Sequence, residues 1–272
     1  MPVHPKITSM KKLVFLLLLH YTAAFAQKNT DLQVEYQAFF DTASPMKMYT
    51  TLYISGNASV YREKYSTKVP WEERTTPEQI EREKRFANNG VPEDYFLKVD
   101  RNKKEILLFD DLVTNVFLVQ DNYEELTWNI TGETKTIAGL SCIKATTNFR
   151  GRDWTAWFAP EIPLAFGPWK LNGLPGLILE AYDSNTTYIM KAVKIEHKKD
   201  DIVTRDFTRL MKTKNRKPIS YQQFIEENEE GWGNFGADLK DNVPEGVTIT
   251  NVTVTSVKTP RTGRELHFEW EP

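Results

Sequence analysis

The sequence predicts a mainly β protein, in which a curved antiparallel sheet or half-open barrel carries one or two short helices. Three observations support this fold class. Apolar and polar residues alternate along residues 32–40, short apolar runs bounded by turn residues recur from 95 to 196, and a long apolar segment near the middle is interrupted by prolines and glycines. Such an interrupted segment forms no long element of its own, so a sheet must shelter it.

The first 26 residues have the pattern of a signal peptide. Three lysines precede the apolar run Leu13 to Leu19, and small residues at 23–26 favour cleavage between Ala26 and Gln27. The apolar run is shorter than a membrane-spanning helix requires, and no later stretch is long enough either. We therefore expect a secreted or periplasmic protein with no transmembrane segment after cleavage. Removal of the segment moves the formal net charge from −2 to −5.

The strands are predicted from period-two alternation and from short apolar runs between turn residues. Gly56-Asn57 marks either a turn between two strands or a bulge that breaks one strand, and Asp183-Ser184-Asn185 marks a hairpin later in the chain. The predicted strands cover residues 32–40, 51–55, 58–61, 95–99, 106–109, 116–119, 125–128, 142–149, 154–158, 177–182 and 187–196. Their short connections favour an antiparallel meander.

Two helices are predicted from capping residues. Thr76, Pro77 and Gln79 start a short exposed helix within residues 71–89, and Ser220 with Gln223 starts another at residues 221–229. The end of the chain returns to strand patterns at 247–254 and 266–270. We therefore expect a β-rich domain over residues 27–197 and a C-terminal extension over 198–272 with a helix and terminal strands, packed on the same domain.

The composition argues against several kinds of chemistry. The acidic balance excludes nucleic acid as an expected partner, because phosphate binding needs a concentrated basic surface. After cleavage only His197, His267 and Cys142 remain as histidine or cysteine ligands, so no metal site is predicted. Cys142 lies in an alternating pattern and is interpreted as a buried thiol. No catalytic residue and no cofactor are predicted, since no phosphate loop, dinucleotide motif or nucleophile elbow occurs.

The segment from Arg150 to Glu180 is the candidate site. It combines large apolar side chains with four prolines, and two arginines lie beside two tryptophans. One interpretation is that it covers the apolar face of the sheet. The other is that it lines a hydrophobic ligand site with cationic groups at its rim. The candidate ligand or structural residues are Arg150, Arg152, Trp154, Trp157, Phe166, Trp169, Leu171, Leu174, Pro175 and Gly176.

At this segment the sequence resembles the GLPGLI family of exported proteins from Gram-negative bacteria. The string itself stands at residues 173–178, and a looser likeness extends from about Val34 to His197. Further residues of this pattern are Ile137-Ala138-Gly139, Cys142, Lys144-Ala145, Gly151-Arg152, Trp157, Ile162-Pro163 and Gly167-Pro168. The resemblance implies export and a β fold, and it brings no catalytic residues.

A weaker analogy concerns the periplasmic lipoprotein carriers, half-open barrels that hold acyl chains. The element from Trp157 to Pro163, followed by a Pro-Gly turn, is similar to that class. Two functional hypotheses follow. The first is a non-enzymatic envelope protein that binds an apolar or lipid-like ligand in a cavity lined by residues 157–178. The second is an adaptor whose exposed strands pair with another envelope protein; a hydrolase is a third, weaker alternative.

Overall fold

The computed structural model describes residues 31–42, 45–64, 94–112, 115–198, 202–214, 217–228, 261 and 263–271. The predicted signal peptide, the predicted helix within 71–89 and the predicted strands at 247–254 lie outside these residues. Among the residues described, no helix is both long and apolar enough to cross a membrane.

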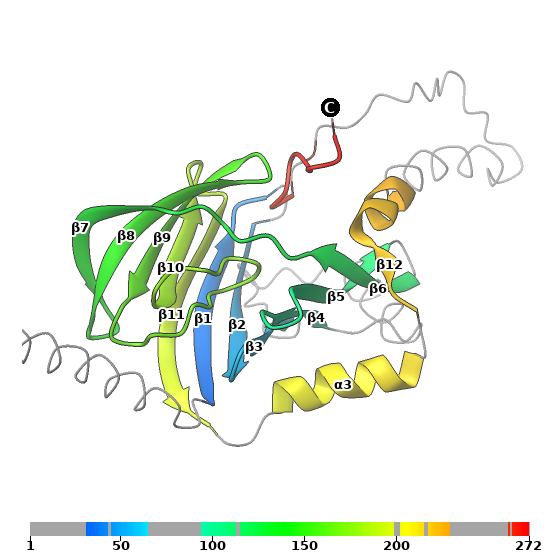
Figure 1. Ribbon diagram of the computed structural model, residues 1–272, viewed down its shortest axis with the longest axis horizontal. Coiled ribbons are helices and arrows are strands. Elements are labelled where there is room, and N and C mark those ends of the chain that lie inside the picture. Colours follow the sequence, from blue (N-terminus) through cyan, green and yellow to red (C-terminus); the bar gives the residue numbers. More distant parts are fainter. Residues whose placement is uncertain are drawn as a thin grey trace, which may run out of the picture.

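The described residues form a strand-rich protein with one long helix and a shorter helical segment at residues 221–228. Figure 1 shows the arrangement. The elements are β1 (Leu32–Phe40), β2 (Met46–Ser55), β3 (Ala58–Lys64), β4 (Asp94–Asp100), β5 (Glu105–Leu112), β6 (Asn115–Asn122), β7 (Asn129–Ile137), β8 (Leu140–Phe149), β9 (Arg152–Ala159), β10 (Leu177–Asp183), β11 (Tyr188–His197), α3 (Ile202–Lys214) and β12 (Ile219–Ser220).

All twelve strands belong to one open, curved sheet with the order β12-β6-β5-β4-β3-β2-β1-β11-β10-β9-β8-β7. This confirms the predicted fold class. The sheet is antiparallel except at one edge, where the two residues of β12 run parallel to β6. Strand β1 closes the gap between two meanders by pairing with β2 on one side and β11 on the other.

The main core lies on the concave face of the sheet. Along β1 every second side chain is buried, from Leu32 to Phe40, as the alternation predicts. Tyr36 donates a hydrogen bond to the carbonyl oxygen of Ile178 at 2.7 Å, which satisfies its hydroxyl inside the core. The same face of β2, β8, β9, β10 and β11 contributes to one continuous apolar cluster.

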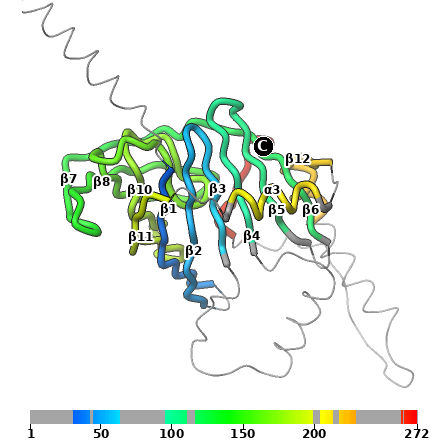
Figure 2. Tube along the Cα trace, turned by 90° about the horizontal axis from the view of Figure 1, so that it is seen from below, coloured from blue at the N-terminus to red at the C-terminus, as the bar shows by residue number. Residues whose placement is uncertain are grey.

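A second apolar cluster lies on the opposite face, between helix α3 and strands β2 to β6. Phe207 of α3 contacts the rings of Phe96 and Phe109, with ring centroids 6.4 and 5.4 Å apart. Figure 2 shows α3 lying across these strands. This helix was not predicted from the sequence, because its apolar residues, such as Phe207, Leu210 and Met211, are interspersed with charged neighbours.

Two strand predictions were wrong. Residues 125–128 form no strand; instead Trp128 donates its indole N–H to the carbonyl oxygen of Asn172 at 2.8 Å, and strand β7 begins only at Asn129. The predicted terminal strand at 266–270 is also absent from the described residues 263–271. Its backbone follows no neighbouring strand, since Leu266 and His267 both donate to the single carbonyl oxygen of Arg150.

Candidate functional site

The segment between β9 and β10, residues 160–176, crosses the concave face of the sheet without a helix or strand, and we call it the motif loop. Its backbone groups bond mainly to one another and to the start of β10. Gly173 donates to the carbonyl oxygen of Ala165, and Ile178 donates to that of Phe166, at 3.1 and 3.0 Å. The loop therefore supplies its own backbone partners, which permits burial of irregular chain.

Glycine is required where the motif loop approaches other backbone. A Cβ atom on Gly176 would lie 2.4 Å from the carbonyl oxygen of Ala159, and one on Gly167 would lie 2.7 Å from that of Leu171. Gly173 has a φ of +95°, which L side chains rarely adopt. The glycines of the motif loop thus allow its backbone to run in close contact with β9 and β10.

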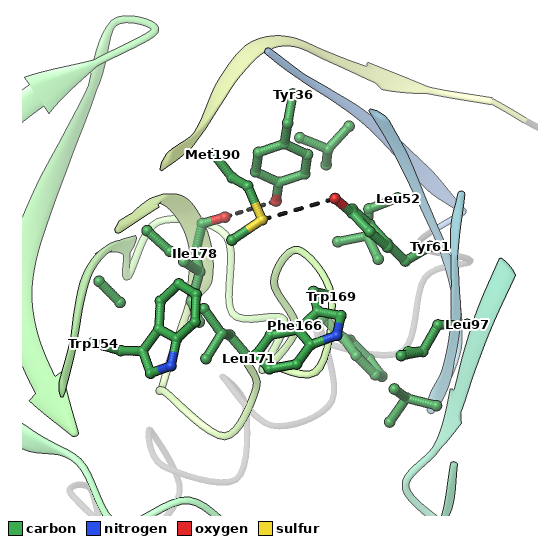
Figure 3. Close-up of a cluster of buried hydrophobic side chains, with 14 of the residues drawn as sticks. Tyr36, Leu52, Tyr61, Leu97, Trp154, Phe166, Trp169, Leu171, Ile178 and Met190 are labelled. Carbon is green, nitrogen blue, oxygen red and sulfur yellow. Dashed lines mark hydrogen bonds between the residues drawn. The ribbon is translucent and has the colours of Figure 1, made fainter. Parts of the chain in front are cut away.

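The large apolar side chains of the motif loop point into the core. Phe166, Trp169, Leu171 and Leu174 each have 3% or less of their surface exposed. Figure 3 shows the first three beside Trp154 and Ile178, surrounded by strands of the curved sheet. Trp154 and Trp169 contact each other with ring centroids 5.6 Å apart. These side chains occupy the concave side of the sheet themselves.

A cluster of buried charges fastens the motif loop to the rest of the protein. Lys170 lies 2.6 Å from a carboxylate oxygen of Asp121 on β6 and 2.7 Å from one of Glu265 near the C-terminus. Arg150, in the turn between β8 and β9, forms a bidentate pair with Asp121 at 2.8 and 2.9 Å. Tyr221 donates a hydrogen bond to Glu265. We call these five residues the ion cluster.

The groups of the ion cluster stay charged because each buried carboxylate faces a cation; Glu269, which is partly exposed, also lies 2.7 Å from Arg150. Burial alone would raise the pKa of Asp121, but Lys170 and Arg150 outweigh burial and hold it below its ordinary value. Burial alone would lower the pKa of the Arg150 guanidinium. The hydrogen bonds to Asp121 and the charge of Glu265 outweigh burial and raise this pKa. Burial and Glu265 together raise the pKa of the Tyr221 hydroxyl, so this group remains a donor.

Arg152 is held by a different set of partners. Its guanidinium lies 2.8 Å from the carboxylate of Asp183 and donates to the carbonyl oxygen of Gly263 at 2.9 and 2.6 Å. It also lies over the ring of Tyr188, 5.0 Å from its centroid. The two arginines predicted as rim cations are therefore bound by carboxylates of the chain itself.

Trp157 lies on the opposite face of the sheet from Trp154, because residues three apart on a strand point to opposite sides. The ammonium of Lys135 lies 4.3 Å from a Trp157 ring centroid and 2.5 Å from the carboxylate of Glu180. The structure thus brings Trp154, Phe166, Trp169, Leu171 and Leu174 together. Trp157 is buried in the same apolar cluster, but on the other side of strand β9. Pro175 and Gly176 form the connection into β10.

Cys142, His197 and His267 are the remaining candidates for catalysis or metal binding. Cys142 is completely buried, and burial raises the pKa of its thiol. His197 and His267 are exposed, on β11 and in the C-terminal segment. Within the ranges that the structure describes, no three histidine, cysteine, aspartate or glutamate residues lie together as a metal site would require.

One surface groove accompanies helix α3. It has a volume of about 410 Å³, is open to solvent, and is lined by Thr204, Arg205, Thr208, Arg209 and Lys212. These residues all belong to one face of the helix, and none of them belongs to the motif loop.

The partners of the candidate residues Arg150 and Trp169 to Leu174 were not predicted from the sequence. Asp121, Lys170, Tyr221 and Glu265 carry the ion cluster together with Arg150, yet they are spread over more than half of the chain. A usable signal existed only for Lys170, which is a lone charge inside the apolar run from Leu164 to Leu174. Such a charge needs a buried partner.

The chain is similar to solved structures of PNGF-II. In one crystal form the TM-score is 0.51 at 15% identity, with 74% of this chain and 34% of that chain covered; in a second form the values are 0.51, 16%, 74% and 33%. The chain thus spans about a third of the length of PNGF-II, and the likeness concerns the fold. A putative outer membrane lipoprotein-sorting protein domain from Vibrio parahaemolyticus aligns with a TM-score of 0.31 at 8% identity, covering 72% of this chain and 97% of that one.

No curated protein sequence matches the chain. A family model described as the N-terminal domain of the N-glycanase peptide matches residues 66–223. The match extends over more than half of the sequence and includes the whole motif loop with β9 before it and β10 after it. The chain therefore belongs to the N-glycanase peptide N-terminal domain family.

Proposed function

We propose that this chain is a non-enzymatic protein of the cell envelope that docks onto another protein through the free edge of strand β7. Export is supported by the signal-peptide pattern of residues 1–26 and by the resemblance to the GLPGLI family. A docking role is supported by the free edge of β7, which is the outermost strand on its side of the described sheet.

The observation that carries the proposal is the position of β7. It is the last strand on its side of the sheet and pairs only with β8 within the described sheet. Six of its nine residues are exposed, and Ile130 is 48% exposed. An unpaired edge offers a row of backbone donors and acceptors to an added strand.

The register of the β7–β8 hairpin identifies the free backbone groups. Ala138 and Gly139 form a two-residue turn with φ values of +50° and +81°. The flanking pair in such a hairpin is hydrogen-bonded, and the pattern then alternates. Lys135 is thus bonded to β8, whereas Thr134 and Thr136 direct their N–H and C=O groups away from it. The irregularity between Ile130 and Thr134 disrupts the other end, so residues 134–137 are the usable edge.

The test is site-specific photo-cross-linking in the protein's own host. A cross-linker at Thr134 should capture one partner protein, and one at the exposed Lys191 on β11 should not. Thr136→Pro removes a free-edge donor without removing a ladder bond, so it should abolish the cross-link and leave the melting temperature nearly unchanged. Thr136→Val keeps the backbone donor and should keep the cross-link. An unchanged cross-link in Thr136→Pro, or equal capture from Lys191, would refute the docking edge.

A second candidate is binding of an apolar or lipid-like ligand, and one observation favours it. The apolar face of the curved sheet is covered by a loop without regular structure, and a ligand of similar shape can replace such a cover. The exchange is costly, because each of the four buried side chains contributes about 1.5–3 kcal/mol of burial. This cost ranks the ligand hypothesis below docking.

Fluorescent fatty acid titrated into delipidated protein tests the second candidate. If the ligand replaces the motif loop, binding should saturate, and amide hydrogen exchange in residues 164–174 should accelerate. Leu174→Asp should alter the affinity. Absence of saturable binding, or saturable binding with unchanged exchange in the loop, would argue against a site on the concave face.

A further inference from the structure

Four aromatic rings surround the guanidinium of Arg264 on the concave side of the sheet. The guanidinium carbon lies 4.8 Å from the ring centroid of Phe40, 5.4 Å from that of Trp169, and 5.8 Å from those of Tyr95 and Tyr188. Each distance is within the range of a cation–π contact. We call these four rings with Glu63 the aromatic cage.

Glu63 supplies the opposite charge of the cage. Its side chain is only 3% exposed, and its carboxylate lies 2.6 Å from Nη2 of Arg264. A carboxylate so deeply buried on β3 requires a cation beside it. Burial alone would lower the pKa of the Arg264 guanidinium, but Glu63 outweighs burial and raises it, so the occupant stays charged.

The cage and its occupant come from different parts of the chain. Phe40, Glu63, Tyr95 and Tyr188 lie on β1, β3, β4 and β11, and Trp169 lies in the motif loop. The rings of Phe40 and Tyr188 also contact each other, with centroids 5.2 Å apart. The cage is thus built by the sheet and the loop.

Arg264 belongs to residues 263–271, which we call the C-terminal strap. The strap forms no strand or helix, and its backbone N–H groups bond to the rest of the protein at Arg150. Within the described part of the chain, Nη1 of Arg264 and Oε1 of Glu63 are both buried without a hydrogen-bond partner, although Oε1 forms an ion pair with Nη2. Arg264 therefore matches the charge of the cage but leaves one of its own N–H groups without an acceptor. An unpaired buried donor weakens the binding of Arg264 in the cage.

The next residue of the strap adds a second contact of opposite sign. Glu265 lies 2.5 Å from Arg150 and 2.7 Å from Lys170. Arg150 and Lys170 thus form a site that binds a carboxylate, beside the aromatic cage, which binds a cation. The two sites bind successive residues of the strap. This arrangement suits a peptide in which arginine is followed by an acidic residue.

We propose that the aromatic cage is a guanidinium-binding site, that Arg264 is its intramolecular ligand, and that an Arg-acidic segment of another polypeptide binds there when the strap leaves. Guanidinium is preferred over ammonium because its plane stacks on aromatic rings and its fork matches a carboxylate. This site lies on the concave face and does not depend on docking at β7.

The first experiment is chemical rescue of full-length Arg264→Ala. The variant leaves Glu63 unpaired, and its melting temperature should fall by roughly 10 °C. Methylguanidinium at millimolar concentration should restore a saturable part of this loss. Methylammonium and sodium chloride at equal ionic strength should not, and the wild-type protein should respond to none of the three. Absence of rescue, or equal rescue by methylammonium, would overturn the guanidinium site.

The control is Glu63→Gln combined with Arg264→Ala. Removal of the unpaired carboxylate should make the double variant more stable than Arg264→Ala, and it should lose the response to methylguanidinium. An undiminished response would show that the cation binds elsewhere. If Arg264→Ala does not accumulate as folded protein, it is refolded from urea with methylguanidinium or with methylammonium, and only methylguanidinium should raise the folded yield. Equal yields with the two compounds would count against the proposal.

A peptide experiment identifies the larger ligand. A labelled peptide of residues 261–269 should displace methylguanidinium from Arg264→Ala and bind at least about ten times more tightly, because once it replaces the strap it also engages Arg150 and Lys170. A peptide with the order of the Arg264-Glu265 pair reversed should lose that gain. Equal affinity of the two peptides would reduce the site to a guanidinium site and refute the peptide part of the proposal.

Discussion

The two halves of the sheet differ in how many of their faces are covered. Strands β3 to β6, the covered half, bury one face in the main core and the other under helix α3. Strands β8 to β11, the open half, bury one face under the motif loop and present polar residues such as Lys144 and Lys191 on the other. One continuous sheet thus combines two kinds of surface.

The difference in how many faces are covered corresponds to a difference in the sequences of the strands. In the covered half the apolar runs are continuous, as in residues 106–109 and 116–119, because both faces are buried. In the open half apolar and polar residues alternate more often, as in β11. In β5 and β6 these runs lie beneath α3, a cover too polar to recognise from its own sequence. Strand β10 of the open half has a comparable run, Leu177 to Leu179, so a continuous run alone does not identify the strands that α3 covers.

The largest expected effect concerns the ion cluster, which ties the two halves together. Asp121 lies in the covered half, and Arg150 lies at the end of the open half. Asp121→Asn removes the carboxylate that pairs with both buried cations, and the free energy of unfolding should fall by about 4 kcal/mol. Urea denaturation near neutral pH measures this loss, with the exposed Asp153→Asn as a control that should lose less than about 0.5 kcal/mol.

The same carboxylate predicts a pH dependence. The pKa of folded Asp121 lies below its ordinary value of 3.8, so its stabilising contribution is complete above 3.8 and is lost as the pH falls through the folded pKa. The stability of the wild-type protein should therefore approach that of Asp121→Asn in strong acid. Curves that remain parallel below the ordinary value would contradict the lowered pKa.

A second prediction tests the cover of the other face. Phe207→Ala removes the side chain by which α3 contacts Phe96 and Phe109, and it should cost about 3 kcal/mol. Thr208→Ala, on the exposed side of the same helix, is the matched control and should change stability by less than about 0.5 kcal/mol. If both variants had equal stability, α3 would not be the cover that distinguishes the covered half.

Much of the fold could be predicted from the sequence because strand periodicity is a local signal. β1 was predicted with its observed bounds, and the hairpins at Gly56 and residues 183–187 follow from their turn residues. The predicted strand at 125–128 failed because a tertiary contact, from Trp128 to the motif loop, determines its conformation. Local pattern cannot report such a contact.

The site was less predictable because its partners are distant in sequence. Arg150 and Arg152 were interpreted as cations for a ligand head group, yet Asp121 and Asp183 are 29 and 31 residues from them, and Glu265 is 115 residues from Arg150. Nothing in the spacing of these acids marks them as partners. Only the burial of the motif loop was implied by the sequence, because its apolar content has to be sheltered.

A third prediction concerns the cover of the open half. Gly176→Ala places a Cβ 2.4 Å from the backbone of Ala159, and the motif loop must shift away from β9. We expect a loss of about 2 kcal/mol, measured as a lower melting temperature. Gly132→Ala in β7 has no neighbouring atom within 4 Å of the added Cβ and should change stability little. Equal shifts for both variants would show that the close approach is not what requires glycine.

The smallest effect gives the sharpest comparison, because one substitution is made in both halves. Val60 on β3 is 3% exposed beneath α3, whereas Val193 on β11 is 49% exposed. Val60→Thr buries a hydroxyl among apolar side chains and should cost about 1–2 kcal/mol, since threonine has the shape of valine and differs in polarity. Val193→Thr places the same hydroxyl in water and should change the free energy of unfolding by less than about 0.5 kcal/mol. A double variant should show the sum of the two effects, because the residues lie in different covers. If Val193→Thr lowered the free energy of unfolding as much as Val60→Thr does, the outer face of the open half would itself be buried by a partner. The loss caused by Val193→Thr should then become smaller when the protein is separated from that partner.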